Sequence, residues 1–169
     1  LCETAHNLGI RVILDGVFSH TGSDSLYFDR QRHFGGKGAY CDPTSPYRSW
    51  YTFHSWPNAY NSWWGFDTLP TVNKMDPAFI DYIITAENSV IAHWLSLGAD
   101  GFRLDVADEL PDAFLKILKT RLRQLKPDAL LMGEVWEDAS NKEAYGIRRR
   151  YFTDGTLDSI MNYPFRTAI

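Results

Sequence analysis

Hydrophobic and polar positions recur along the chain in one repeated order: an amphipathic helix, a break, a short apolar strand and an acidic residue. In the first copy a helix stops at Gly9, and an apolar strand over 12–14 leads into Asp15. Such alternation is typical of proteins whose strands are joined through helices.

The second copy begins at Asp76-Pro77, a helix-start signal because proline suits the first turn of a helix. Apolar residues then recur at helical spacing as far as Gly98, so the pattern predicts one continuous helix. A strand over 101–105 follows and ends at Asp105.

The third copy predicts a helix over 111–125 and a strand over 129–133 that ends at Glu134. A fourth strand is predicted over 157–162. Strands that alternate with helices imply an α/β fold, with a parallel sheet and right-handed crossovers. The carboxyl ends of such strands meet at one edge of the sheet, where ligands bind. We therefore expect Asp15, Asp105 and Glu134 to gather there.

A long insertion separates the first two copies. Asp105 and Glu134 are 29 residues apart, whereas Asp15 and Asp105 are 90 apart, which leaves about 60 residues beyond one ordinary unit. The surplus, over 19–75, holds 13 of the 25 aromatic residues, including Trp50, Trp56, Trp63 and Trp64. Most of these rings are expected to form the small core of a subdomain. One or two are expected to bind ligand, and the sequence does not choose among them.

Composition narrows the class of protein. Hydrophobic residues make up 44% and charged residues 22% of the chain, as in globular domains. The net charge of −4 and the lack of a long basic run argue against nucleic-acid or membrane partners. Because Leu1 opens inside a helical pattern with no signal segment before it, we expect an internal piece of a longer protein, and no compartment is predicted.

Arg103 and Asp105 carry the candidate chemistry. Residues two apart in a strand point to the same face, so the guanidinium lies beside the carboxylate and favours its ionised form, which suits a nucleophile. Glu134 follows Gly133 and has no basic neighbour in sequence, so apolar surroundings are expected to raise its pKa, which suits a proton donor. Two carboxyls in opposed environments match a retaining glycosidase.

Arg103, Asp105, Asp15 and His20 each also have a purely structural interpretation. The Arg103–Asp105 pair could be an internal ion pair that only fixes packing. Asp15 could cap backbone N–H groups, and His20 could be a solvated loop residue.

Five segments resemble the alpha-amylase family of glycoside hydrolases, in the branch of neopullulanases, cyclomaltodextrinases and maltogenic amylases. They are DGVFSH (15–20), LPTVN (69–73), GFRLDVADE (101–109), GEVWED (133–138) and MNYPF (161–165). The resemblance implies a partial (β/α)8 TIM barrel, with about strands 3 to 6 and an irregular subdomain inserted after strand 3. The implied parts are barrel at 1–18, inserted subdomain at 19–75, and barrel at 76–169.

The resemblance also implies roles for single residues. Asp105 would be the nucleophile and Glu134 the general acid/base. Substrate-binding roles would fall to Arg103, His20, Asp15 and Trp136. A third catalytic carboxylate would come from outside these residues, so the chain alone is expected to be inactive.

The implied substrate is an α-glucan or maltooligosaccharide, with α-1,4 and α-1,6 bonds both candidates. No cofactor is expected. Calcium is weakly supported because Ser19 and Thr71 stand where many relatives have calcium-ligating Asn and Asp. Dimerisation of the full-length protein is left open. One alternative is a glucan-binding or scaffold protein on the same fold. Another is a metal-dependent lyase or isomerase barrel, against which Arg103 argues because it would repel a divalent cation.

Overall fold

The computed structural model describes all 169 residues, which form two compact units. The first unit comprises Leu1–Gly16 and Ile80–Ile169, and the second comprises Val17–Phe79.

Helices and strands alternate along the first unit as the sequence predicts. The helices of the chain are α1 (Cys2–Asn7), α2 (Pro77–Ile80), α3 (Val90–Ser96), α4 (Asp112–Leu125) and α5 (Tyr163–Ala168), with a π-helical turn over Asp81–Thr85. The strands are β1 (Ile13–Gly16), β2 (Phe53–Ser55), β3 (Ala59–Tyr60), β4 (Gly101–Leu104), β5 (Leu130–Gly133), β6 (Glu143–Ala144), β7 (Ile147–Arg148) and β8 (Ser159–Ile160).

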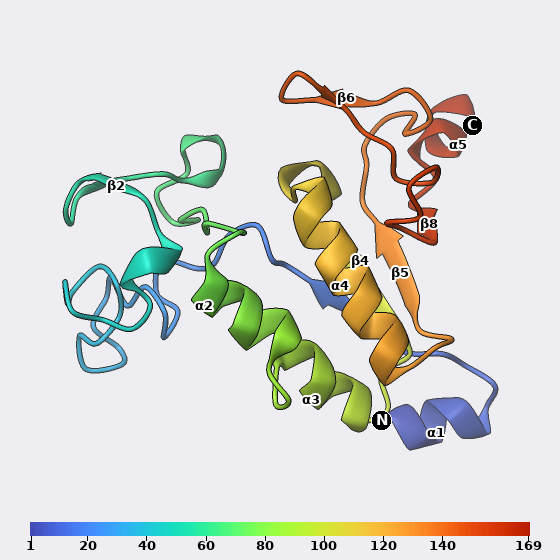
Figure 1. Cartoon of the computed structure of the whole chain (residues 1–169), viewed down its shortest axis with the longest axis horizontal. Coiled ribbons are helices and arrows are strands. Elements are labelled where there is room, and N and C mark those ends of the chain that lie inside the picture. The colour runs from blue at the N-terminus through green and yellow to red at the C-terminus, as the bar shows by residue number, and fades with distance from the viewer. The chain divides into compact units, whose positions relative to one another are not determined.

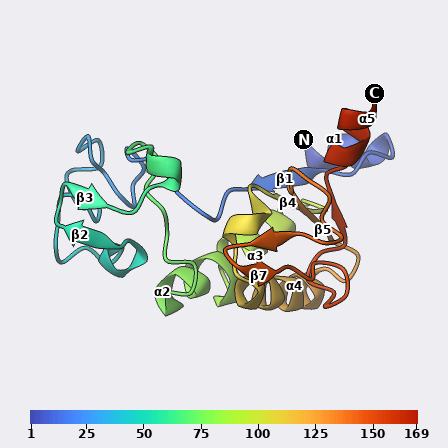
Figure 2. The same ribbon diagram turned by 90° about the horizontal axis from the view of Figure 1, so that it is seen from above.

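Four parallel strands form the sheet of the first unit, in the order β1-β4-β5-β8. Helix α4 lies in front of β4 and β5 in the view of Figure 1, and the second view places α3 and α4 on the same face of the sheet (Figure 2). The predicted parallel sheet is confirmed, and the predicted fourth strand is present but shorter.

Side-chain alternation explains how this sheet packs. On β4, Phe102 and Leu104 are buried in the core, whereas Arg103 points to the other face. On α4, four residues at helical spacing are fully buried: Phe114, Leu115, Leu118 and Leu122.

The continuous helix predicted from 76 to 98 is wrong. The chain leaves the helical conformation at Ala86, where ψ is 151°, and α3 starts again after Ser89. The Ser89 hydroxyl accepts a hydrogen bond from the Ala92 N–H at 3.4 Å and donates one to the Ile84 carbonyl at 3.0 Å. The buried Ser89 thus caps the start of α3 and binds a carbonyl of the π-helical turn before it. Apolar periodicity does not reveal this role.

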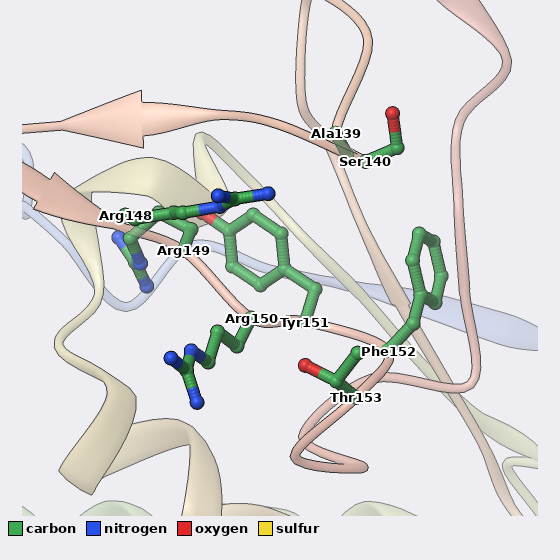
Figure 3. Close-up of a pocket in the computed structure, with 8 residues that line it drawn as sticks. All are labelled: Ala139, Ser140, Arg148, Arg149, Arg150, Tyr151, Phe152 and Thr153. Atoms are coloured by element: carbon green, nitrogen blue, oxygen red, sulfur yellow. The ribbon is translucent and has the colours of Figure 1, made fainter.

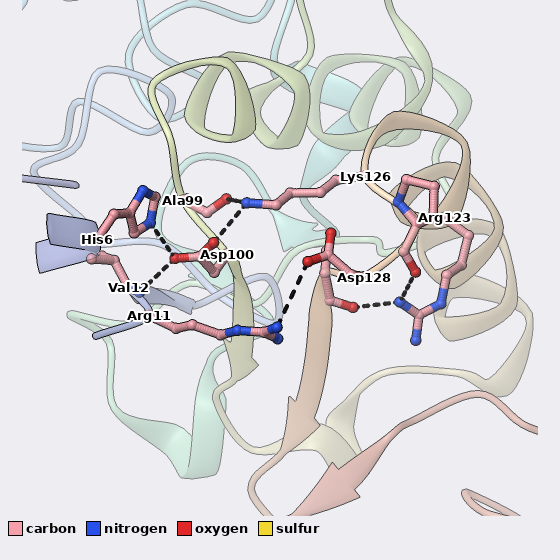
Figure 4. A network of polar contacts seen from close by, with 10 residues as sticks. His6, Arg11, Val12, Ala99, Asp100, Arg123, Lys126 and Asp128 are labelled. Carbon is pink, nitrogen blue, oxygen red and sulfur yellow. Dashed lines mark hydrogen bonds and ion pairs between the residues drawn. The ribbon is translucent and has the colours of Figure 1, made fainter. Parts of the chain in front are cut away.

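A charged network lies at the amino ends of the strands, around Asp100 (Figure 4). The Asp100 carboxylate accepts hydrogen bonds from His6 Nε2 at 2.7 Å, the Val12 N–H at 2.8 Å and Lys126 Nζ at 2.7 Å. Burial raises the pKa of Asp100, but these donors outweigh it and hold the pKa well below its ordinary range. One carboxylate therefore ties α1, β1 and the end of α4 to the start of β4.

The second unit has an aromatic core. Phe28 is fully buried, and its ring lies 4.8 Å from that of Tyr60 and 4.9 Å from that of Tyr51, in edge contacts. Trp50 is also buried. The hairpin of β2 and β3 is the regular sheet of this unit.

Candidate active site

Arg103 is the centre of the candidate site. Its Nη1 lies 2.7 Å from Asp15 Oδ1 and 2.9 Å from Asp105 Oδ1, and its Nη2 lies 2.9 Å from Glu134 Oε1. Its Nε contacts Met161 Sδ at 3.4 Å. The guanidinium side chain is only 22% exposed, so these ion pairs are partly shielded from water.

Strand register explains why three acids meet at one arginine. Asp15 pairs with Arg103 across β1 and β4, and Leu104 pairs with Gly133 across β4 and β5. Asp105 and Glu134 follow directly after those paired residues. The expected gathering of the three acids at the carboxyl edge is therefore present in the structure.

Burial differs among the three carboxylates. The Asp15 side chain is 58% exposed, whereas that of Glu134 is 9% exposed. An exposed carboxylate keeps most of its hydration, so the ion pair to Asp15 is the weaker one. Glu134 and Asp105 are the better shielded acids.

Glu134 does not lie in the apolar environment that the sequence predicts. Burial raises its pKa, but hydrogen bonds from the Val106 N–H, Trp136 and Tyr163, together with the charge of Arg103, outweigh burial and lower the pKa. The prediction of a raised pKa is therefore wrong. It failed because the lack of a basic neighbour in sequence says nothing about Arg103 on the adjacent strand.

An unusual backbone conformation links the two shielded acids. Val106, directly after Asp105, is left-handed, with φ 39° and ψ 60°, which is rare for a β-branched residue. Its N–H donates to Glu134 Oε2 at 3.0 Å, and the next N–H, of Ala107, donates to the Glu134 carbonyl at 3.0 Å. This sharp turn holds Glu134 against the end of β4.

A cavity of about 610 Å³ opens beside Glu134. It is lined by Glu134, Trp136, Tyr163, Arg166 and Thr167. The Tyr163 hydroxyl donates to Glu134 Oε1 at 2.9 Å. Tyr163 lies in the segment MNYPF, where sequence reasoning assigned it no role, although Asn162 and Pro164 signal the helix start that positions it.

His20 belongs to the second unit, Val17–Phe79. Its Nδ1 is hydrogen-bonded to the Ser19 hydroxyl at 2.7 Å, and its ring stacks on Trp63 with centroids 5.5 Å apart. Since its ring is held by both contacts, His20 is not a freely solvated loop residue.

A second cavity, of about 350 Å³, lies in the segment after β5 (Figure 3). Its lining includes the consecutive Arg148, Arg149 and Arg150. Arg149 is buried and donates to Asp112 Oδ1 and to the carbonyls of Asp108 and Leu110. The buried arginine therefore joins the loop after β4 to the segment after β5.

The donor set at Arg103 does not suit a metal ion. Its carboxylate oxygens bind a guanidinium, whose charge repels a divalent cation. No group of three or more His, Cys, Asp or Glu side chains in the chain has an arrangement that could hold a metal. Ser19 and Thr71 carry hydroxyl groups, so neither adds a carboxylate oxygen that could bind calcium. Every helix is too short or too polar to cross a lipid bilayer.

Known proteins similar to this chain agree with one another. Residues 1–169 match the family model described as "Alpha amylase, catalytic domain". An amylopullulanase of Thermoanaerobacter thermohydrosulfuricus is 37% identical over 190 residues, covering 100% of this chain and 12% of that protein. Neopullulanase 2 of Thermoactinomyces vulgaris is 32% identical over 176 residues, covering 100% of this chain and 27% of that protein.

A solved structure agrees as well. The crystal structure of Ttha1563 from Thermus thermophilus superposes with a TM-score of 0.76 at 35% identity, covering 99% of this chain and 33% of that one. The chain thus spans 12% to 33% of the length of these proteins. Its four parallel strands are part of a TIM barrel, as predicted. This chain belongs to the alpha-amylase catalytic-domain family.

Proposed function

We propose that this chain is the part of a retaining glycoside hydrolase that carries its nucleophile and its general acid/base, and that the substrate is an α-glucan. The observation that supports this most directly is the convergence of Asp15, Asp105 and Glu134 on Arg103, in a chain of the alpha-amylase family. The names amylopullulanase and neopullulanase among its relatives support starch-like and pullulan-like substrates, with α-1,4 and α-1,6 bonds.

In the first step an Asp105 carboxylate oxygen attacks the anomeric carbon while the bond to the leaving oxygen breaks. The leaving oxygen takes the proton of Glu134, so a covalent glycosyl–Asp105 ester and an ionised Glu134 result. The Arg103 guanidinium, 2.9 Å from Asp105, orients the attacking group.

In the second step Glu134 removes a proton from water, whose oxygen attacks the same carbon and releases Asp105. The four donors that lower the pKa of Glu134 favour the ionised form, which this step requires. The first step requires the protonated form. Among the donors to Glu134, the Tyr163 hydroxyl can turn away when substrate enters, which would favour the protonated form.

Other residues of the resemblance take supporting roles in this proposal. Arg103 and Asp15 position the sugar at the carboxyl edge of the sheet, and Trp136, which lines the cavity beside Glu134, faces the leaving group. His20 binds sugar from the inserted subdomain. That subdomain spans 19–75, between barrel parts at 1–18 and 76–169.

Asp105→Asn in the intact protein tests the assignment, with Asp128→Asn as the matched control because Asp128 is an exposed carboxylate before the amino end of β5, at the opposite end of the strand from Glu134. Asp105→Asn should reduce kcat on maltooligosaccharides by about 10⁴-fold or more, with the circular dichroism spectrum unchanged. The control should retain full activity. Turnover within tenfold of wild type in a folded Asp105→Asn protein would remove the nucleophile assignment. An intact wild type that binds but never cleaves glucans would favour the scaffold alternative.

A further inference from the structure

The tryptophans of the second unit differ sharply in exposure. Trp50 is buried in the aromatic core, and Trp56 donates its indole N–H to the Ala39 carbonyl at 3.0 Å. Trp64, by contrast, exposes 67% of its surface. An exposed ring that belongs to a larger aromatic surface, unlike a scattered single one, is a mark of binding. Trp64 is therefore the most exposed tryptophan of the second unit.

Trp64 is the outer member of a stack of three rings. The Trp63 and Trp64 rings lie 4.9 Å apart with an interplanar angle of 13°, and the His20 ring stacks on Trp63 with an angle of 23°. Phe66, also exposed, lies 6.2 Å from Trp63. The aromatic surface is therefore continuous with His20, a residue proposed above to bind sugar.

Backbone hydrogen bonds hold the loop that carries these rings. The Trp63 N–H donates to the Leu69 carbonyl at 2.9 Å, and the Thr71 N–H donates to the Asn61 carbonyl at 2.9 Å. Thr71 also pairs with His20 as an isolated bridge. Because both sides of the loop are fixed, its rings present a surface whose geometry exists before any ligand arrives.

The backbone at Trp64 is unfavourable for a bulky residue. Its φ of 50° and ψ of 26° are left-handed, and Gly65 follows with φ 80°. Glycine and asparagine adopt this conformation readily, whereas a large side chain rarely does. Both the left-handed backbone and the exposed ring are unfavourable for the stability of the fold. Such unfavourable features cluster at ligand-binding sites.

We propose that Trp64 is a stacking platform for a glucosyl ring of an α-glucan chain. The C–H face of a pyranose is apolar and flat enough to pack on an indole, which offers a wide rigid surface at little entropic cost. This inference rests on the proposed function, because it names a further binding residue for the same substrate class.

Binding measured without turnover tests the proposal. The reference is the intact protein carrying Asp105→Asn, titrated with maltohexaose by calorimetry. Adding Trp64→Asn should raise Kd roughly tenfold, since the apolar area of one ring face is lost. Trp64→Tyr keeps a ring and should stay within about threefold. Trp94→Ala removes an exposed tryptophan of α3 and should leave Kd unchanged.

Thermal stability separates binding from folding. Asparagine suits the left-handed backbone, so Trp64→Asn should melt at the same temperature as the reference or higher while binding more weakly. An unchanged Kd overturns the proposal, as does a lowered melting temperature, which would make Trp64 a structural residue. Failure of the reference to bind maltohexaose also overturns it. Full hydrolytic activity of the Asp105→Asn reference would instead overturn the nucleophile assignment. Even then, weaker binding by Trp64→Asn would still support the role of Trp64 as a platform.

Discussion

The network around Asp100 predicts a large loss of stability for the substitution Asp100→Asn. The side chain is 10% exposed, and its two oxygens accept three hydrogen bonds, from His6 and Val12 on one side and Lys126 on the other (Figure 4). Asparagine has the same shape but only one accepting oxygen. Whichever way the amide turns, its NH2 group faces at least one of these donors.

The expected magnitude follows from those contacts. A hydrogen bond to a charged group contributes about 1.5–3 kcal/mol, and a buried donor left without an acceptor costs about 1–3 kcal/mol. Asp100→Asn should therefore lower the free energy of unfolding by about 2–4 kcal/mol. Asp128→Asn is the matched control, because Asp128 is 65% exposed and 3.8 Å from Arg11, so its loss should cost less than about 1 kcal/mol.

Urea unfolding of the intact protein, followed by circular dichroism at several pH values, measures both effects. Because the folded pKa of Asp100 is depressed, its stabilisation is fully present above the unfolded pKa of about 3.9 and is lost as the pH falls through the folded pKa. The difference between wild type and Asp100→Asn should thus persist from pH 7 to 5 and shrink in stronger acid. Equal stability of the two variants at pH 7, or a difference that grows on acidification, would refute the reasoning.

Three further predictions concern the site and the sheet. Tyr163→Phe removes a donor that lowers the pKa of Glu134, so this pKa should rise and the alkaline limb of kcat/KM against pH should move to higher pH. An unmoved limb would contradict the role of this contact. In Arg103→Lys one ammonium group cannot reach three carboxylates, so kcat/KM should fall about 10²-fold or more. Wild-type kinetics would show that the fork geometry is dispensable. Gly101→Ala would place a Cβ 2.0 Å from the Leu130 carbonyl oxygen, so it should lower the free energy of unfolding by about 3 kcal/mol or more and reduce the yield of folded protein. A normal melting temperature would refute the close approach of β4 and β5.

Periodicity in the sequence was sufficient for the regular part of the fold. The buried faces of β4 and α4 follow directly from spacings of two and of three to four residues, because those spacings are properties of the backbone itself. Periodicity failed between 76 and 98, where apolar spacing continues across a break made by Ser89. It also gave no signal for the short hairpin of β6 and β7, whose strands have two residues each.

The sequence alone determined that three acids lie at or next to the carboxyl ends of β1, β4 and β5, and that Arg103 shares a face with Asp105. Both follow from local geometry. Only the tertiary structure decided that the same guanidinium reaches Asp15 and Glu134, because that depends on which strands are neighbours and in what register. The lowered pKa of Glu134 and the exposure of Trp64 belong to the same category. Charge and solvent act through space, so residues distant in the chain set them.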